Sequence, residues 1–290
     1  MNAALSSLGS WPGAAAAGFI GLGDGEGSAG IPLDATVEGP ADRVFRWASI
    51  TKVLTALCIW VAVEEGTVAW DDPAGPPGST LADLLSHASG LSSNSDAVMT
   101  QPRRRRIYSN SGIESAARHL ERRAGISFFE YLSEGVLGPL QLDATRLDGS
   151  PAHGARGPLT DLLKLARELL EPTLVSHGTL ALATSVACPG LAGVLPGFGR
   201  QAPNDWGLGV EIRDSKSPHW TGRNNSPSTF GHFGQAGGFV WVDPDRGLAL
   251  AALGEAPFGP WAANAWPLLS DSVIASSPGY LSSPGGQRSP

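Results

Sequence analysis

The chain has 290 residues, 42% of them hydrophobic, and carries a formal net charge of −7 at pH 7. This length and apolar content are enough for one large domain or two interleaved lobes with a proper core. The acidic balance argues against a nucleic-acid-binding surface, and no segment resembles a basic amphipathic membrane helix. We therefore expect a small-molecule or peptide partner, and neither a nucleic acid nor a membrane.

The first elements along the chain are strands followed by one long apolar helix. Residues 14–22 are predicted to form a strand, 23–30 a turn and 44–47 a second strand. The apolar run 49–65 is predicted to be a helix that ends at Gly66, a natural C-cap. Two glutamates close this run, which is therefore too short to cross a membrane.

The middle of the chain has a different character. Beyond a Pro/Gly-rich stretch at 71–78, short helices with capping signatures follow one another to about residue 195, with no convincing strands. The residue pairs expected to open these helices are Thr80 with Asp83, Ser111 with Glu114, Ser127 with Glu130, and Thr160 with Asp161. This part of the chain is predicted to form a helical lobe.

Strand signals return late in the chain. The predicted strands are 206–212, 238–242 and 247–253, and a hairpin turn at 243–247 joins the last two. A final helix is predicted over 260–275, and we expect the Ser/Pro/Gly-rich tail after it to be disordered.

Strands at both ends of the chain, around a helical insertion, predict an α/β fold with an all-α lobe: an antiparallel β-sheet flanked by helices, and helices beside it. We expect a discontinuous sheet lobe from residues 1–70 and 200–275, a helical lobe from 71–199, and a disordered tail at 276–290. The sequence shows no internal repeat.

The first candidate for chemistry is Ser49, three residues before Lys52 at the head of the apolar helix. Residues three apart share one face of a helical turn, so the hydroxyl lies beside the amine. The helix N-terminus and partial desolvation both lower the pKa of a lysine there, and a neutral amine can then accept the serine proton. Backbone N–H groups at a helix start can also bind an oxyanion. The simpler alternative is that Ser49 only caps the helix.

Two further segments carry candidate site residues. Tyr108 and Asn110 lie two apart in a loop, where the phenol can transfer a proton and the amide can hold both a substrate carbonyl and the lysine. His232 lies in a glycine-rich block, where it can shuttle a proton or bind a carboxylate. Taken alone, these segments also fit an asparagine near a helix start and a bulged strand with a surface histidine.

The three motifs, Ser-x-x-Lys, Tyr-x-Asn and His-x-Gly, occur together and in this order. They resemble the signatures of the serine β-lactamase and penicillin-binding-protein superfamily. Flanking segments are similar to the class C β-lactamase-related branch, which includes esterases and D-alanyl-D-alanine carboxypeptidases. These segments are 47–52, 64–66 with 70–73, 84–91, 206–209 and 231–238, so that the resemblance runs over about 44–253.

The resemblance implies a role for each motif residue. It implies Ser49 as the acylated nucleophile, Lys52 as its base, and Tyr108 as the phenol that shuttles protons in acylation and deacylation. The residues implied to bind substrate are Asn110, His232, Gly234, Gln235 and Ala236. The oxyanion hole is implied to be the backbone N–H of Ser49 together with that of Gln235 or Ala236.

The sequence also departs from the family pattern. His232 stands where most β-lactamases have lysine, which weakens the case for a carboxylate-bearing β-lactam as substrate. The deacylating glutamate of class A enzymes has no convincing counterpart, and the segment before Ser49 is short for the usual N-terminal helix. The arginine run 103–106 fits either an exposed basic loop or a rim for anionic substrates.

No cofactor or metal is expected, because the remaining histidines lack metal-ligand spacing. Cys58 and Cys188 lie in apolar surroundings and are predicted to be buried free thiols. The N-terminal residues contain neither a basic region nor a convincing cleavage site, so we expect a cytoplasmic protein.

The leading hypothesis is a cytoplasmic serine hydrolase that acts through an acyl-Ser49 intermediate on a small ester or amide. One alternative is a D-alanyl-D-alanine carboxypeptidase or weak β-lactamase. Another is a catalytically idle binding module that keeps the fold.

Overall fold

The computed structural model describes residues 2–22 and 35–277. The predicted turn at 23–30 and residues 278–290 of the predicted disordered tail lie outside this part of the chain.

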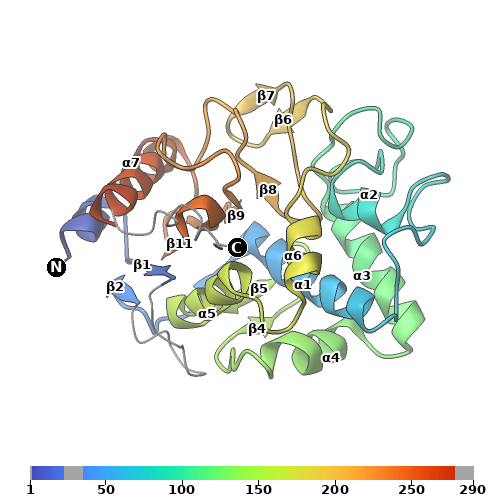
Figure 1. The fold of residues 1–290 in the computed structure, drawn as a ribbon, viewed down its shortest axis with the longest axis horizontal. Helices are drawn as coiled ribbons and strands as arrows, with labels where there is room; N and C mark the ends of the chain where they lie inside the picture. Colours follow the sequence, from blue (N-terminus) through green and yellow to red (C-terminus); the bar gives the residue numbers. More distant parts are fainter. Residues whose placement is uncertain (1, 23–34, 278–290) are drawn as a thin grey trace, which may run out of the picture.

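A six-stranded antiparallel sheet forms the centre of the molecule, in the order β2-β1-β11-β10-β9-β8 (Figure 1). Its strands are β1 (Ala15–Gly21), β2 (Thr36–Glu38), β8 (Glu211–Ile212), β9 (Phe230–Gly234), β10 (Gly238–Asp243) and β11 (Leu248–Gly254). The predicted strands at 14–22, 238–242 and 247–253 are confirmed, as is the hairpin between the last two, which turns through η4 (Pro244–Arg246). The predicted strand at 206–212 is wrong in its extent, because only its last two residues join the sheet.

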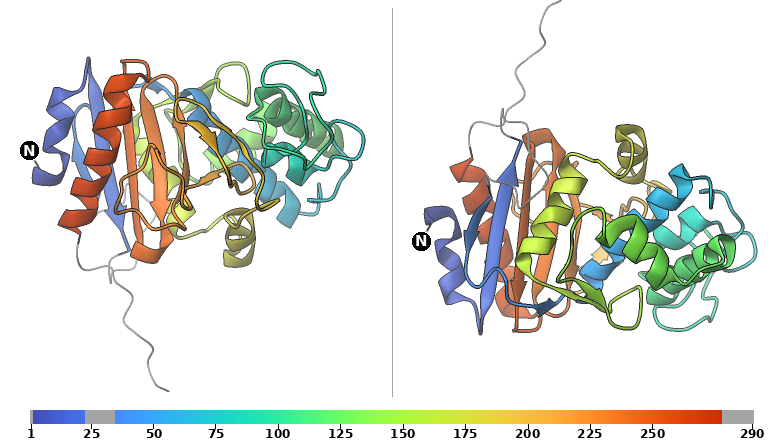
Figure 2. Two further views of the ribbon diagram at one scale, coloured as in Figure 1. Left: turned by 90° about the horizontal axis from the view of Figure 1, so that it is seen from above. Right: turned by 90° about the horizontal axis from the view of Figure 1, so that it is seen from below.

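Helices cover both faces of this sheet. One face carries α7 (Pro260–Ser276), the predicted final helix, together with the 3₁₀ helix η1 (Ala3–Ser10). The other face carries α5 (Leu159–Leu170), which packs on β1, β10 and β11. Figure 2 shows the sheet between these layers. The first strand thus joins strands from the far end of the chain, as the prediction requires.

The alternation of side chains along β10 explains the two layers. Phe239 and Trp241 belong to the buried cluster under α7, whereas Val240 and Val242 belong to the cluster on the α5 side. Successive strand residues point to opposite faces, so one short strand supplies apolar surface to both. The structure confirms the predicted fold class, an antiparallel sheet flanked by helices with a largely helical region beside it.

The helical region contains short strands, which the sequence did not indicate. One of them pairs with the predicted strand at 44–47, which therefore belongs to a separate small sheet and not to the central one. The helices of the region are α2 (Leu81–Leu85), α3 (Asn110–Ala124), α4 (Phe128–Leu132), the π-helical turn η3 (Ser133–Leu137) and α6 (His177–Ala183). The two small sheets are β3-β5-β4 (Phe45–Arg46, Ala155–Gly157, Arg146–Leu147) and β6-β7 (Gly193–Leu195, Gly199–Gln201). The predicted lobe boundaries, 1–70 with 200–275 and 71–199, remain a prediction, and α5 from the middle range packs on the sheet.

Two of the four predicted caps are confirmed. Thr80 forms a complete capping box with Asp83, and the Ser127 side chain caps α4. The prediction at Ser111 is wrong, because α3 begins two residues earlier, behind Ser109, whose hydroxyl accepts from the Gly112 N–H at 2.9 Å. The prediction at Thr160 is also wrong. Helix α5 begins after Pro158 without a side-chain cap.

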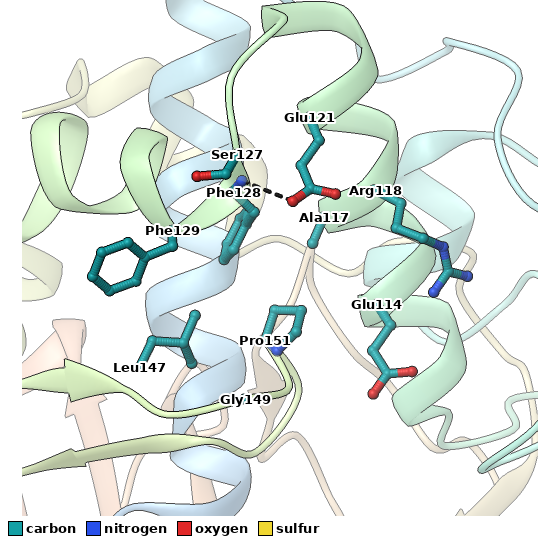
Figure 3. Close-up of a pocket in the computed structure, with 10 residues that line it drawn as sticks. All are labelled: Glu114, Ala117, Arg118, Glu121, Ser127, Phe128, Phe129, Leu147, Gly149 and Pro151. Carbon is teal, nitrogen blue, oxygen red and sulfur yellow. Dashed lines mark hydrogen bonds between the residues drawn. The ribbon is translucent and has the colours of Figure 1, made fainter.

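A cavity of about 440 Å³ lies between α3, α4 and the segment 147–151. Figure 3 shows Phe128, Phe129 and Leu147 along one side of it and residues of α3 along the other. Glu114 points into the gap between α3 and Pro151. Neither Ser49 nor any other predicted site residue lines this cavity.

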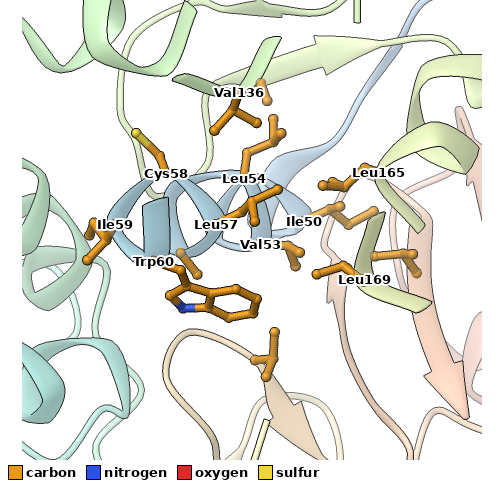
Figure 4. Close-up of a cluster of buried hydrophobic side chains, with 14 of the residues drawn as sticks. Ile50, Val53, Leu54, Leu57, Cys58, Ile59, Trp60, Val136, Leu165 and Leu169 are labelled. Carbon is orange, nitrogen blue, oxygen red and sulfur yellow. The ribbon is translucent and has the colours of Figure 1, made fainter. Parts of the chain in front are cut away.

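Helix α1 (Thr51–Glu64) runs through the centre of the molecule and is buried along nearly all its length. Figure 4 shows Leu165 and Leu169 of α5 against Ile50 and Val53 at its N-terminal end. Complete burial of such aliphatic side chains contributes about 2 kcal/mol each, so the start of α1 is firmly fixed. The helix has charged residues only at its C-terminal end and at Lys52, which is fully buried.

Candidate active site

Ser49 lies in η2 (Ala48–Ile50), a 3₁₀ turn between β3 and α1, so the predicted helix start at Ser49 is two residues early. The turn is tight. Ala48 has a φ of 47°, which residues with a Cβ rarely adopt. The hydroxyl of Thr51 holds the turn, donating to the Ala48 carbonyl at 2.6 Å and accepting from the Ala155 N–H at 2.9 Å. Ser49 itself is only partly buried and can be reached by a substrate.

The amine of Lys52 has three oxygen neighbours. Its Nζ lies 2.7 Å from the Asn110 Oδ1, 2.8 Å from the Ala152 carbonyl oxygen and 3.3 Å from the Ser49 Oγ. The first two oxygens can only accept, so they occupy the two hydrogens of a neutral amine. The remaining lone pair is then available to the Ser49 hydroxyl, which is the arrangement that a general base needs.

Burial lowers the pKa of Lys52 to about 7, and the negative charge of Glu114 opposes this shift. A buried ammonium loses its hydration, which disfavours the charged form. Near neutral pH a large fraction of the amine is therefore uncharged. The pairing of desolvation with a fixed hydrogen-bond frame is typical of catalytic lysines.

Tyr108 and His232 are neighbours that line one small cavity with Ser49. The Nδ1 of His232 is 2.6 Å from the Phe233 carbonyl oxygen, which fixes the hydrogen on Nδ1 and leaves Nε2 to accept from the Tyr108 hydroxyl at 3.4 Å. Burial lowers the pKa of His232 to about 3, and the nearby Lys52 adds to the effect. His232 is therefore a neutral acceptor and not a cation.

Burial raises the pKa of Tyr108 well above its usual value, although a hydrogen bond with Ser49 opposes the rise. The Tyr108 ring also lies over the Lys52 amine, with Nζ 4.8 Å from the ring centroid. Tyr108 is thus a neutral phenol that contacts both Ser49 and the Lys52 amine. A neutral phenol can donate a proton, and its raised pKa makes it a weaker candidate for the initial base than Lys52.

Asn110 is the first residue of α3, directly behind the Ser109 cap. Its Oδ1 accepts from Lys52, and its Nδ2 donates to the Asn94 side chain at 2.7 Å. These two contacts fix the orientation of the amide. The structure therefore brings Asn110 to the lysine, while its role toward a substrate stays a prediction.

The end of β9 approaches the nucleophile turn closely. A Cβ on Gly234 would lie 2.2 Å from the Trp47 carbonyl oxygen, so this position requires glycine. Gln235 follows in the turn after β9 and lines a small cavity with Ser49, whereas Ala236 is not among its lining residues. This placement favours Gln235 over Ala236 as the second donor of the predicted oxyanion hole.

The cavity at Ser49 holds about 30 Å³ and its wall is mainly apolar. Its other lining residues are Tyr108, Leu195, Pro196, Trp206, Glu211, His232, Phe233 and Gln235. The sequence indicated Trp206 and Phe233 only within segments that resemble the family, and it carried no signal for Leu195 and Pro196, which lie at the end of β6 and in the turn after it. A single apolar residue in a short strand or turn does not indicate that it lines a cavity.

Glu211 is a fully buried carboxylate at the wall of this cavity. It accepts from the Lys216 amine at 3.0 Å, from His219 at 3.0 Å and from the Trp220 indole N–H at 2.6 Å. Burial alone would raise the pKa of Glu211, but Lys216 and His219 hold it far below its usual value. The Lys216 charge is thus matched inside the protein and is not offered to a ligand.

The arginine run is not one uniform basic loop. Arg104 and Arg105 are exposed, whereas Arg106 is buried and donates to the main-chain carbonyls of Ser86, Ala187, Cys188 and Asn204. Arg103 pairs with the Asp83 carboxylate at 2.6 Å. Arg106 is therefore a structural residue, which neither reading of the run anticipated.

The two cysteines differ in burial. Cys58 and Cys188 are free thiols as predicted, but Cys188 is only partly buried. Within residues 2–22 and 35–277, no cluster of three or more His, Cys, Asp or Glu side chains could hold a metal ion.

The antiparallel sheet, the helical region beside it and a serine paired with a buried lysine define a class, the β-lactamase and penicillin-binding-protein-like serine hydrolases. The chain belongs to the β-lactamase family, whose model matches residues 14–270.

Solved structures agree with this assignment. A beta-lactamase from Mycobacterium bovis is 52% identical, with a TM-score of 0.89, over 94% of this chain and 99% of that one. Simvastatin synthase from Aspergillus terreus is 16% identical, with a TM-score of 0.72, over 94% and 96% of the two chains. EstCE1, a hydrolase with promiscuous acyltransferase activity, is 15% identical, with a TM-score of 0.71, over 93% and 96%. The last two likenesses show a shared fold. No curated protein sequence matches the chain.

Proposed function

We propose that the protein is a serine hydrolase that forms an acyl-Ser49 intermediate on a small, uncharged ester or amide. The observation that carries the proposal is the frame around Lys52. Two fixed acceptors occupy the hydrogens of its amine and direct the lone pair at the Ser49 hydroxyl. A module without chemistry has no need to keep an uncharged lysine in this position, and this argues against an idle binding module.

The reaction follows from these contacts. Lys52 takes the hydroxyl proton while the Ser49 Oγ attacks the substrate carbonyl, and the backbone N–H groups of Ser49 and Gln235 stabilise the oxyanion. Tyr108 gives a proton to the leaving group and recovers one from the Lys52 ammonium. In deacylation a water molecule attacks the acyl carbon and its proton passes to this Tyr108–Lys52 pair. The bond between the acyl carbon and the Ser49 Oγ then breaks, and the pair returns a proton to that oxygen.

The preference for an uncharged substrate rests on the charges around the cavity. Most carboxylate-binding sites offer a free cation, usually an arginine or lysine. Here the nearby Lys216 and Arg106 are buried with protein partners, and His232 is neutral. Among the described residues that line the cavity, none is a lysine or arginine. Its volume of about 30 Å³ favours a short acyl group.

A second candidate function is a weak β-lactamase or D-alanyl-D-alanine carboxypeptidase. It is favoured by the 52% identical structure, which is described as a beta-lactamase. Both substrates carry a carboxylate, for which the cavity offers no matched cation. The esterase proposal therefore predicts faster acylation by short neutral esters than by either of these substrates.

The test is a substrate panel with matched variants. Wild type, Ser49→Ala and Ser10→Ala are each incubated with short-chain nitrophenyl esters, with nitrocefin and with a peptide ending in D-Ala-D-Ala. Product formation from each substrate and covalent adducts on the protein are measured. Ser10 is an exposed serine of η1, far from the site in sequence, and serves as the control. The proposal expects ester turnover that Ser49→Ala loses and Ser10→Ala keeps. Equal behaviour of wild type and Ser49→Ala with every substrate would end it.

We also propose a cytoplasmic location. Both cysteines are free, which is usual in a reducing compartment. Separately, no helix within the described residues is long and apolar enough to cross a membrane. Cell fractionation with an antibody against the chain tests the location, and recovery from the periplasm or the medium would contradict it.

A further inference from the structure

Glu114 lies at the start of the second turn of α3, four residues after Asn110, and its side chain is half-buried. The sequence pattern assigned it to a capping box with Ser111, which the structure does not form. Its Oε1 instead accepts a hydrogen bond of 2.6 Å from the hydroxyl of Ser150, a residue 36 positions away. Figure 3 shows the Glu114 carboxylate at the wall of the 440 Å³ cavity, beside Pro151.

Ser150 connects Glu114 to the catalytic lysine. The Ser150 Oγ accepts from the Ala152 N–H at 3.0 Å, and the Ala152 carbonyl accepts from the Lys52 amine at 2.8 Å. Between them, the Pro151 carbonyl accepts from the Thr55 hydroxyl at 2.6 Å. The segment 150–152 is thus tied to α3 on one side and to α1 on the other.

The charges around the amine single out Glu114. Lys52 is faced by Tyr108, by His87 and by His232 on β9, and burial keeps both histidines uncharged by lowering their pKa values. Burial likewise raises the pKa of Tyr108, so the phenol is neutral. Glu114 is the negative charge that raises the pKa of Lys52 against the effect of burial.

We propose that Glu114 is a positioning residue for Lys52. Through the Ser150 hydroxyl and the Ala152 carbonyl it holds the amine against Ser49, and its carboxylate is the counter-charge of the lysine. This inference rests on the proposed function only where it concerns the acylation of Ser49. The geometric connection and the electrostatic effect on the amine require no substrate.

Two variants separate charge from position. Glu114→Gln keeps an acceptor for Ser150 but removes the charge, whereas Ser150→Ala keeps the charge but removes the link to Ala152. Glu134→Gln, an exposed carboxylate of η3 outside the cavity, is the matched control. The chain has three lysines, Lys52, Lys164 and Lys216, so ¹³C labelling at the lysine ε-carbon gives few signals to assign.

The titration midpoint of Lys52 in these spectra is the first readout. Glu114→Gln is expected to lower it by about one pH unit, while Ser150→Ala and Glu134→Gln leave it near the wild-type value. The second readout is the rate of Ser49 acylation by a nitrophenyl ester at a pH above the midpoint. Ser150→Ala is expected to reduce this rate about tenfold or more, since a displaced base loses its alignment, and Glu134→Gln leaves it unchanged.

An unchanged midpoint in Glu114→Gln, or a wild-type acylation rate in Ser150→Ala, would overturn the inference. A Glu114→Asp variant that restores the wild-type midpoint supports the charge effect and guards against a folding artefact in Glu114→Gln. If wild type forms no acyl-Ser49 at all, the proposed function fails, and the Lys52 titration alone then decides the inference.

Discussion

The amine of Lys52 lies 2.7 Å from the amide oxygen of Asn110, closer than the 3.3 Å that separates it from the Ser49 hydroxyl. Asn110 is therefore part of the frame that holds the lysine amine as well as a predicted substrate contact. An uncharged amide accepts from the amine without stabilising the ammonium as a carboxylate would. An asparagine here therefore favours the uncharged form of the lysine, which the proposed reaction requires.

Asn110→Asp should raise the pKa of Lys52 and slow acylation at neutral pH. A carboxylate at hydrogen-bond distance favours the ammonium and raises the pKa of Lys52, by about 1–3 units for a close opposite charge. The acid limb of the acylation rate should then move to higher pH by a similar amount, and the rate at neutral pH should fall. The pH profile of Ser49 acylation by an ester checks this. If the acid side of the profile stayed where it is in wild type, the assigned contact between Asn110 and the Lys52 amine would be refuted.

Tyr108→Phe should slow both halves of the reaction, most visibly deacylation. The phenylalanine keeps the ring over Lys52 but removes the hydroxyl that touches Ser49 and His232. Loss of a proton-transfer group costs about a hundredfold or more, so acyl-enzyme should accumulate after a burst. Rapid-quench mass spectrometry measures this.

The same change at Tyr131 is the matched control, because its hydroxyl bonds to Glu65 away from the site. Tyr131→Phe should leave both rates unchanged. Steady turnover by Tyr108→Phe at the wild-type rate would remove Tyr108 from the mechanism.

His232 should remain neutral throughout the range in which the enzyme works. Its pKa is lowered to about 3 by burial and by Lys52, so lowering the pH from 8 to about 5 leaves the ring uncharged. Nitrogen-detected NMR should show a single Nδ1–H tautomer across this range, with the signals assigned by loss in His232→Asn. A titration of this ring near its ordinary pKa would contradict the neutral site and reopen binding of carboxylate substrates.

Gly234→Ala should destabilise the fold and disturb the nucleophile turn. The new Cβ would lie 2.2 Å from the Trp47 carbonyl oxygen, and forcing that contact apart costs about 1–3 kcal/mol. Gly9→Ala is the matched control, since a Cβ there meets nothing within 4 Å. Denaturant unfolding of both variants checks the difference. Equal stability would mean that β9 and the turn are not held as tightly as described.

The sequence pointed to Ser49, Lys52, Tyr108 and Asn110 because each pair lies close together in the chain and carries its own spacing. The strands β1, β10 and β11 were also predictable, since a short run of apolar and small residues and a hairpin turn are local signals. The structure brings Ser49, Lys52 and Asn110 together from η2, α1 and α3, and Tyr108 from the loop before α3. Their catalytic roles remain predictions.

The features of the fold and the site that the sequence did not predict depend on contacts between distant parts of the chain. Glu114 carries a capping pattern with Ser111, but Ser109 takes that role and frees the carboxylate for Ser150. In the sequence Arg106 resembles its neighbouring arginines, which suggests exposure. In the structure it donates to main-chain carbonyls of distant segments. The partners of Glu211 follow it within nine residues, but nothing in their spacing shows that they fold back onto one carboxylate.

The most direct test of the account is the pH dependence of acyl-Ser49 formation. Wild type and Lys52→Met are mixed with a short nitrophenyl ester between about pH 5 and 9, quenched in acid, and the peptide containing Ser49 is weighed. Because the pKa of Lys52 is lowered to about 7, the neutral amine and the acylation rate should rise through pH 7 and then level off. Lys52→Met should lose this rise and acylate at least a hundredfold more slowly. A wild-type rate that does not change with pH, or an adduct that forms equally fast in Lys52→Met, would contradict the assignment of Lys52 as the base.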